Sequence, residues 1–200
     1  YITYDRGRPL HVFDADKLTG TISARLGKPG ESLLALDGKT YAVDDSICVI
    51  AADAAVLGLA GVMGGETTGS TDATTSVFIE SAFFDSSRTA RTGRRLGLNS
   101  DARFRFERGV DPGFVVAGLE LATRMVLDLC GGEASEIVVA GKEPLPNKVI
   151  DFPLSEVKRL SGLDLSAETI TDTLEKLGFS TTGSGDSRSV AVPSWRPDVY

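Results

Sequence analysis

The chain has 200 residues, a composition typical of globular proteins and a formal charge of −7. Its length suits one or two domains with a sizeable core, and its charge argues against a general nucleic-acid-binding protein. No apolar run is long enough to span a membrane and no basic, apolar leader opens the sequence, so we expect a cytoplasmic protein. Because the chain begins at Tyr1 without a Met, we also expect it to be a segment of a longer protein.

The first third of the chain predicts β-structure. Asp37-Gly38 is a two-residue hairpin signal, and 47–51 is a continuous apolar run of the kind found in strands buried on both faces. The segment 55–59 is expected to pair with 47–51 and to run into the glycine-rich stretch GLAGVMGGETTG at 58–69. Further strands are expected at 21–25, 32–36 and 77–84.

Two helices follow. Asp85 or Ser86 can cap the first, and Gly97 can end it in a left-handed conformation. Asp111 is the expected N-cap of the second, with Pro112 in its first turn. Apolar side chains then recur at helical spacing, which predicts a core helix that ends at 131–132. The recurring residues are Phe114, Gly118, Leu121, Met125 and Leu129.

The segment 141–147 has the composition of a linker, which predicts two domains, 1–143 and 144–200. In the second domain we expect a short strand, two helices capped by Ser155 and Ser166, and a hairpin. The predicted fold class is therefore α+β: a mixed, β-rich domain with helices packed on it, followed by a small winged-helix-like domain truncated at its C-terminal side.

The two cysteines carry no metal-ligand spacing. Cys48 and Cys130 each lie in an apolar stretch, without a CxxC motif, and the chain has a single histidine. We predict that both are buried, reduced thiols.

The glycine-rich stretch does not have the spacing of a phosphate loop. Gly58, Gly61 and Gly64 are three residues apart, and no Lys-Ser/Thr pair follows them. A stand-alone nucleotide-binding protein is therefore disfavoured. Glycine also lets a ligand approach the backbone closely, and we expect Gly64-Gly65 to offer such bare backbone.

Three other residues indicate a pocket. Glu80 is a lone acid in the apolar VFIESAFF segment, His11 is the single histidine, and Ala102 is a small residue among large ones. Each also has a structural explanation. Glu80 can pair with an arginine such as Arg91, His11 can be a satisfied core histidine, and Ala102 can allow close packing.

Positive charge is concentrated between Arg88 and Arg108. Seven arginines accompany only two acidic residues in this segment, although the chain as a whole is acidic. The pattern suits an anionic partner that is contacted at one place, and it suits equally a solvated helix face with internal salt bridges.

Three ordered motifs resemble the beta-subunit family of bacterial phenylalanyl-tRNA synthetases. They are RPLHVFDADKL (8–18), LAGVMGGETTGSTDATTSVFIESAFFD (59–85) and RRLGLNSDARFRFERGVDP (94–112). They are similar to the editing module of that subunit, and 146–200, with its VPSWRPD motif, resembles the small domain that follows. The resemblance covers nearly the whole chain.

The resemblance implies a part of phenylalanine–tRNA ligase that hydrolyses tyrosine wrongly attached to tRNA(Phe). The family's editing site uses a histidine, a loop glycine, a strand glutamate and an alanine, which correspond here to His11, Gly64, Glu80 and Ala102. Glu80 would accept a hydrogen bond from the tyrosine hydroxyl, and His11 would orient the ester or a water. Gly64 would let the acyl end approach the backbone, and Ala102 would leave room for the ring. Family residues upstream of the histidine fall outside this sequence.

The resemblance also implies partners and cofactors. Arg88, Arg91, Arg94 and Arg95 would contact the tRNA acceptor end. An alpha subunit, in a two-alpha two-beta tetramer, would carry the synthetic site and use ATP and Mg²⁺. Asp198 matches the first of several magnesium ligands whose others lie beyond residue 200, so neither cofactor is expected to bind this chain tightly. The alternative is a tRNA-binding or scaffold segment without catalytic activity of its own.

Overall fold

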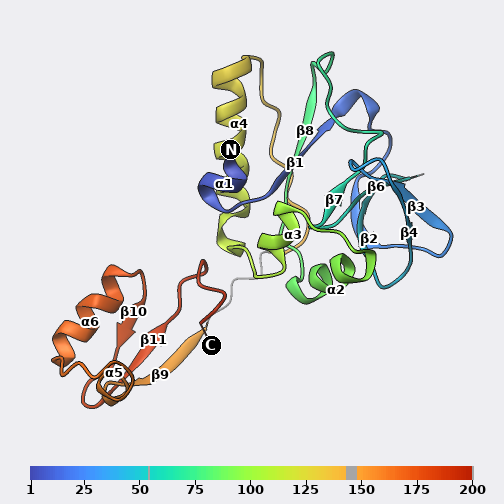
Figure 1. Cartoon of the computed structure of the whole chain (residues 1–200). Coiled ribbons are helices and arrows are strands. Elements are labelled where there is room, and N and C mark those ends of the chain that lie inside the picture. Colours follow the sequence, from blue (N-terminus) through green and yellow to red (C-terminus); the bar gives the residue numbers. More distant parts are fainter. Residues whose placement is uncertain (54, 143–147, 200) are drawn as a thin grey trace. The chain divides into compact units, whose positions relative to one another are not determined.

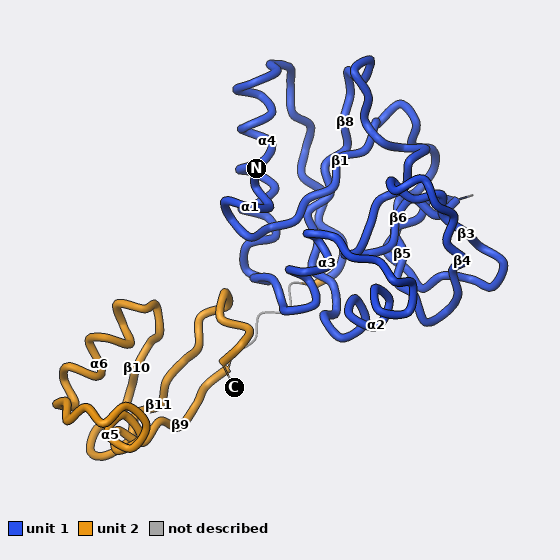
Figure 2. The backbone as a smooth tube through the Cα atoms, in the orientation of Figure 1, with its two compact units in different colours: residues 1–141 blue, residues 142–200 orange. Residues whose placement is uncertain are grey.

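A computed structural model describes residues 1–53, 55–142 and 148–199. The chain forms two compact units, Tyr1–Gly141 (unit 1) and Lys142–Tyr200 (unit 2), and each is described by itself (Figures 1 and 2). The predicted boundary after residue 143 falls at the start of 143–147, outside the described residues. Across the described ranges, no helix is both long and apolar enough to cross a membrane.

Unit 1 is built on a four-stranded antiparallel sheet in the order β2-β5-β6-β7. All of β6 and most of β5 are buried, as expected for strands made of apolar runs. The strands predicted at 21–25, 47–51 and 55–59 are confirmed. The sheet consists of β2 (Ser23–Leu26), β5 (Cys48–Ala51), β6 (Val56–Leu59) and β7 (Met63–Gly64).

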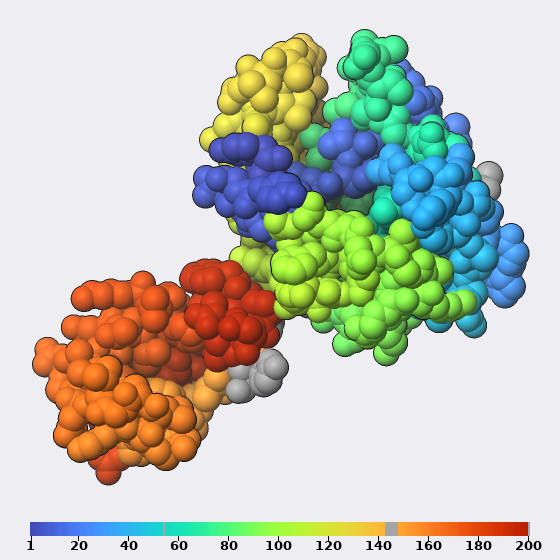
Figure 3. Space-filling model, viewed as in Figure 1, coloured from blue at the N-terminus to red at the C-terminus, as the bar shows by residue number. Residues whose placement is uncertain are grey.

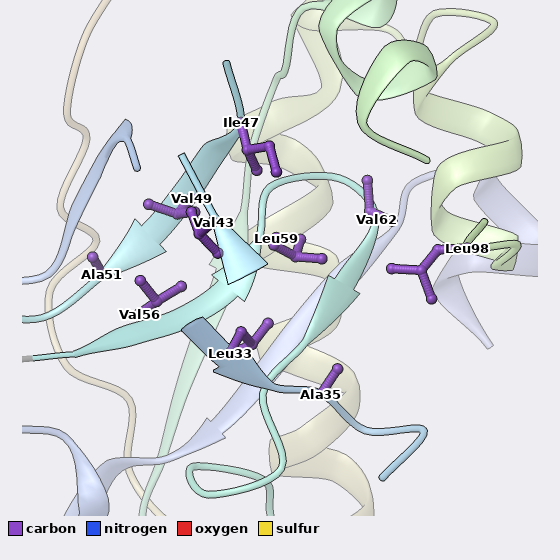
Figure 4. Close-up of a cluster of buried hydrophobic side chains, with 10 residues drawn as sticks. All are labelled: Leu33, Ala35, Val43, Ile47, Val49, Ala51, Val56, Leu59, Val62 and Leu98. Atoms are coloured by element: carbon purple, nitrogen blue, oxygen red, sulfur yellow. The ribbon is translucent and has the colours of Figure 1, made fainter. Parts of the chain in front are cut away.

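A hairpin of β3 (Glu31–Leu34) and β4 (Thr40–Val43) packs against this sheet. Its predicted turn is present, and Gly38 has a φ of 77°, which favours glycine. A single bridge joins Ala35 to Gly65, just after β7. The main core lies between hairpin and sheet (Figure 4). It contains Leu33, Ala35, Val43, Ile47, Val49, Ala51, Val56, Leu59, Val62 and Leu98.

A separate two-stranded ribbon is formed by β1 (Leu10–Asp14) and β8 (Val77–Ser81). The sequence predicted β8 but not β1. The helix α4 (Val115–Cys130) packs along β8, where the Ser81 hydroxyl donates to the Val115 carbonyl at 2.7 Å. On the other side of the ribbon, Phe13 packs with apolar residues of the sheet. The ribbon therefore lies between the sheet and α4, as Figure 1 also shows.

The helix α2 (Ser86–Leu96) has the predicted caps. The Asp85 carboxylate accepts the Arg88 N–H, and Gly97 has a left-handed φ of 66°. Two short helices, α1 (Ile2–Arg6) and α3 (Asp101–Phe106), were not predicted. Helices of this length show little periodicity in sequence, and their stability comes from tertiary contacts.

The cap at Asp111 and the position of Pro112 are confirmed, but the start and the environment of the predicted core helix differ from the prediction. Asp111 caps a 3-10 turn, η2 (Pro112–Phe114), by accepting the Gly113 N–H, and α4 begins only at Val115. Gly118 and Ala122 are its only buried residues, so the helix covers the ribbon with one narrow face. A Cβ atom on Gly118 would lie 3.1 Å from Cγ of Arg8, so this glycine leaves room for the Arg8 side chain.

The end of α4 also corrects the prediction for the cysteines. Leu129 is 74% exposed and Cys130 is exposed, whereas Cys48 on β5 is half-buried. The apolar sequence around Cys130 belongs to a peripheral helix end and not to the core.

Unit 2 is a three-stranded sheet in the order β10-β11-β9 with two helices. Ser166 caps α6 as predicted, whereas Ser155 is the first residue of α5 and makes no cap hydrogen bond through its side chain. The strand, two helices and hairpin agree with the winged-helix-like prediction. The elements are β9 (Val149–Pro153), α5 (Ser155–Ser161), α6 (Ala167–Lys176), β10 (Ser180–Thr182) and β11 (Ser187–Ala191).

Candidate active site

The ribbon places His11 and Glu80 directly opposite each other. Their Cα atoms are register partners in the antiparallel pair β1·β8. Opposed residues point to the same face, with Cβ atoms about 5 Å apart. Phe13 and its partner Phe78 lie on this face as well, and the His11 and Phe13 rings meet edge to face at 4.3 Å between centroids. The face that turns toward the sheet thus carries one imidazole, one carboxyl group and two aromatic rings.

Gly64 completes this group from strand β7. A Cβ atom on Gly64 would lie 2.0 Å from Cε1 and 2.6 Å from Nε2 of His11, so the imidazole rests on the bare backbone of this residue. Gly65 has a similar role, because its Cβ would lie 2.6 Å from the Leu57 carbonyl oxygen. On the side where a Cβ atom would lie, these two glycines are therefore already in contact with His11 and with β6.

Glu80 has no ion pair among the described residues, so the suggested partnership with Arg91 is not formed. Burial alone raises the pKa of the Glu80 carboxyl group to about 7. Burial also lowers the pKa of His11, and its Nε2 atom is buried without a hydrogen-bond partner. Near neutral pH the site thus holds an uncharged imidazole and a carboxyl group close to its midpoint. An unpaired buried polar atom is costly, which favours a ligand or water at Nε2.

Cys48 is a neighbour of this site that the sequence did not reveal. Burial is the main reason that the pKa of its thiol is raised, the Arg88 guanidinium opposes that shift, and the Glu80 carboxylate adds to it. Cys48 therefore lies near both charges. The register of β5 could not be related to β8 from the sequence, because the two strands belong to different sheets.

Ala102 lies on α3, a helix that is bonded to the glycine-rich stretch. The hydroxyl of Ser100, the N-cap of this helix, donates to the Val62 carbonyl, two residues before Gly64. Arg103 folds over Gly93 of α2 and donates to the Leu98 carbonyl, which fixes the other side of the helix. Ala102 is half-buried there. The structure thus brings His11, Gly64 and Glu80 into direct proximity and ties the helix that carries Ala102 to the same glycine stretch.

The predicted arginine contacts lie on one stripe of α2. At about 100° per residue, their positions fall on the side opposite the buried residues Thr89, Ala90, Thr92 and Gly93. They differ in their partners. Arg95 pairs with Asp44, and Arg88 donates to the Ser46 carbonyl. Arg91 and Arg94 are exposed and have no ion pair or hydrogen bond within the described part of the chain.

The remaining arginines of the cluster make internal contacts. Arg103 pairs with Glu107, as does Arg108, and Arg105 pairs with Asp101. The two interpretations of the cluster therefore divide between helices. The arginines of α3 and its C-terminal end form internal salt bridges, whereas Arg91 and Arg94 of α2 are exposed without an ion pair to any described residue.

The residues around Asp198 do not by themselves fit a magnesium ion. Both carboxylate oxygens of Asp198 accept hydrogen bonds from Arg196, at 3.1 Å each. Within the described ranges no three acidic, histidine or cysteine residues gather into a metal-binding group. A magnesium ion would need to displace Arg196 and recruit oxygen ligands from elsewhere.

Comparison with known proteins agrees with the division into two units. The B3/4 domain family matches residues 1–131, and the tRNA synthetase B5 domain family matches residues 150–200. The phenylalanine–tRNA ligase beta subunit of Rhodopseudomonas palustris is 54% identical over 200 residues, and that of Nitrobacter winogradskyi is 56% identical over 199 residues. Each comparison covers 100% of this chain, but 25% and 24% of the two relatives, so the chain spans about a quarter of their length.

A solved N-terminal fragment of the phenylalanyl-tRNA synthetase beta subunit from Pyrococcus horikoshii can be aligned with this chain. The alignment covers 100% of this chain and 59% of the solved fragment. The TM-score is 0.46 and the sequence identity 19%. The family matches and the curated relatives are much stronger than this likeness. The chain belongs to the B3/4 domain family and carries the B3/4 and B5 domains of a phenylalanine–tRNA ligase beta subunit.

Proposed function

We propose that unit 1 hydrolyses the ester of tyrosine mistakenly attached to tRNA(Phe). The observation that supports this most strongly is the carboxyl group of Glu80, which is partly buried, has no ion pair in the described part of the chain and lies opposite His11, whose ring rests on Gly64. A structural carboxyl group in this position would be expected to have a cationic partner. Glu80 has none among the residues that the structure describes, so its burial is best explained by a ligand that supplies a hydrogen bond.

The same carboxyl group accounts for selectivity. The tyrosine hydroxyl donates to Glu80, and phenylalanine leaves that acceptor buried and unpaired. A site built to hydrogen-bond a hydroxyl group can reject the analogue that lacks it far more strongly than shape alone allows. Phe78, which is 41% exposed on the same ribbon face and contacts the buried ring of Phe13, supplies an apolar surface for the tyrosine ring. Ala102, on the neighbouring helix, leaves room for it.

Hydrolysis requires a water next to the ester carbonyl. The neutral imidazole of His11 can accept a hydrogen bond at its unpartnered Nε2 and hold that water. The water oxygen then attacks the acyl carbon and the ester bond to the ribose breaks. One water proton ends on the ribose oxygen, and the other is released as the new carboxyl group of tyrosine ionises. The products are tyrosine and intact tRNA, and no covalent enzyme intermediate is needed.

We further propose how the chain contacts tRNA(Phe) and in which assembly it acts. Arg88, Arg91, Arg94 and Arg95 form a cationic stripe suited to the phosphates of tRNA(Phe). In the cytoplasm, the chain would act within a two-alpha two-beta synthetase whose alpha subunit carries out ATP- and Mg²⁺-dependent aminoacylation. The residues described here would not hold either cofactor.

The test is deacylation of Tyr-tRNA(Phe) and Phe-tRNA(Phe) by this chain and its Glu80→Ala variant. We expect the parent chain to release tyrosine preferentially, and the variant to lose that preference. Glu66→Ala, which removes an exposed acid from the glycine-rich stretch, is the matched control and should keep this preference. If Glu80→Ala retains full preference for tyrosine, the role of Glu80 is wrong. If the parent chain binds tRNA(Phe) without hydrolysing either ester, the result favours the alternative of a tRNA-binding segment.

A further inference from the structure

The outward face of α3, together with α1, presents two aromatic rings that are each stacked against an arginine. Asp101, Phe104, Arg105 and Arg108 recur at three- and four-residue spacing and so share one helical face. Phe104 is 55% exposed, and the Arg108 guanidinium carbon lies 3.7 Å from the centroid of its ring. Tyr4 of α1 is 72% exposed, and the Arg105 guanidinium carbon lies 4.9 Å from its centroid. Figure 3 shows α1, in dark blue, beside the yellow-green surface of α2 and α3.

Hydrogen bonds hold these rings and guanidinium groups in place. The Tyr4 hydroxyl donates to the Asp101 carboxylate at 2.5 Å, and Arg105 donates to the Asp101 carbonyl at 2.9 Å. Arg108 donates to the Phe104 carbonyl at 2.8 Å. The stacks are therefore ordered before any partner arrives, which lowers the entropy cost of binding. None of these contacts buries the rings, so the fold of α3 does not require aromatic side chains at these positions.

We infer that this aromatic–arginine face (Tyr4, Phe104, Arg105 and Arg108) binds the unpaired nucleotides at the 3′ end of tRNA by stacking. Aromatic rings and guanidinium planes are the surfaces on which proteins stack the bases of single-stranded RNA. The inference rests on the proposed function and names the part of the tRNA that this surface holds.

Two features of the surroundings favour a nucleic acid over a protein partner. The adjoining helix α2 exposes Arg91 and Arg94 without ion pairs among the described residues, and these cations suit the phosphates next to the stacked bases. The cap of α3 is bonded to Val62 in the glycine-rich stretch, so the same helix connects the stacking face with the candidate active site. Nucleotides held on this face would lead the 3′ ester toward His11 and Glu80.

The experiment measures binding of uncharged tRNA(Phe) carrying 2-aminopurine as its 3′-terminal base, since this fluorophore is quenched when it stacks. A shortened tRNA(Phe) without the unpaired 3′ nucleotides is the second ligand. Phe104→Leu removes the ring, and Arg108→Lys keeps the charge but removes the planar stack. Phe83→Leu is the matched control, because Phe83 is 39% exposed and has no arginine over its ring within the described chain.

We expect Phe104→Leu to weaken binding of the intact tRNA by roughly tenfold and to abolish quenching. Arg108→Lys should give a smaller loss in the same direction, and Phe83→Leu should give none. None of the variants should change binding of the shortened tRNA. Equal losses on both tRNAs, or unchanged quenching in Phe104→Leu, would overturn the inference.

A Phe104→Leu variant that binds tRNA normally but no longer associates with the alpha subunit would identify the face as a protein interface and would also overturn it. Because the ligands carry no amino acid, stacking is measured independently of hydrolysis. Failure of the proposed editing reaction and failure of this inference therefore give different results.

Discussion

The two units of the chain differ in whether they bury ionisable side chains. Unit 1 buries Arg8 and Asp14, and its candidate site holds a carboxyl group and an imidazole whose pKa values are shifted by burial. Unit 2 buries only apolar residues among those that the structure describes, and its ion pairs lie at the surface. Burial of unpaired ionisable groups lowers stability, so a unit that retains them has a use for them beyond folding. The chemistry of this chain is therefore to be sought in unit 1.

Arg8 shows that a buried charge can also be structural. It is 1% exposed and donates to the carbonyls of Ala82 and Asp111, which joins the end of β8 to the turn before α4. Arg8→Met would leave both carbonyls without this donor. We expect unit 1 to lose about 3 kcal/mol of unfolding free energy, measured by hydrogen exchange of its amides.

The matched change in unit 2 is Arg188→Met. Arg188 also donates to two carbonyls, those of Gly185 and Ser187, but near the surface. We expect a loss of less than about 1 kcal/mol, followed by fluorescence of Trp195, the single tryptophan of the chain. Equal losses from the two substitutions would remove the contrast between the units.

Glu80 makes the stability of unit 1 depend on pH. Its folded-state pKa of about 7 lies above the ordinary value of 4.5, so the folded unit binds an extra proton between these pH values. The contribution of Glu80 is therefore most favourable below pH 4.5 and is lost as the pH rises through 7. We expect Glu80→Gln to be more stable than the parent chain at pH 8, by up to about 3 kcal/mol, and to show no advantage at pH 4.5.

Urea unfolding at several pH values, followed through unit 1, measures this difference. His11 has the opposite sign, because its lowered pKa gives a contribution that is lost as the pH falls below 6.5. The parent profile alone therefore mixes two effects, and the variant must be compared with the parent at each pH. Glu120→Gln, at an exposed carboxylate of α4, is the control. A constant offset between Glu80→Gln and the parent would contradict the raised pKa.

Gly64 tests the geometry of the candidate site. Gly64→Ala would put a methyl group into the His11 ring, and displacement of a positioning group by about 1 Å costs on the order of 100-fold in rate. We expect deacylation of Tyr-tRNA(Phe) to fall by about that factor. Gly58→Ala is the control from the paired strand, since its Cβ would meet the nearest atom at an ordinary 3.4 Å. If both alanine variants keep full activity, His11 does not act from the position that the structure gives it.

The sequence predicted the elements with strong local signals and missed those that depend on tertiary contacts. The Asp37-Gly38 turn and the caps of α2 were correct because the residues themselves favour those conformations. The residues of α4 gave the correct helix but the wrong environment, because periodicity shows a face and not what covers it. Strand β1 was missed because its pairing with β8 spans more than sixty residues of sequence.

The features of the candidate site also divide into those that the sequence identified and those that required tertiary structure. Residue type and motif resemblance both selected His11, Gly64 and Glu80, but the direct opposition of His11 and Glu80 required the register of the ribbon. The contact between Gly64 and the His11 ring required the position of β7. Cys48 had no motif and was found only through its proximity to Glu80 and Arg88.

The smallest expected effects concern the arginine stripe of α2. Arg91→Gln and Arg94→Gln remove exposed cations that have no ion pair among the described residues. Each should weaken binding of tRNA(Phe) a few-fold and lower the slope of log Kd against log salt by about 1. Arg95→Gln is the matched control, because the Asp44 carboxylate already neutralises Arg95. Its slope should change less. Fluorescence anisotropy over a series of salt concentrations measures all three variants. Equal slopes for Arg91→Gln, Arg94→Gln and the parent chain would show that phosphates do not contact this stripe, and the cationic surface of unit 1 would then need another partner.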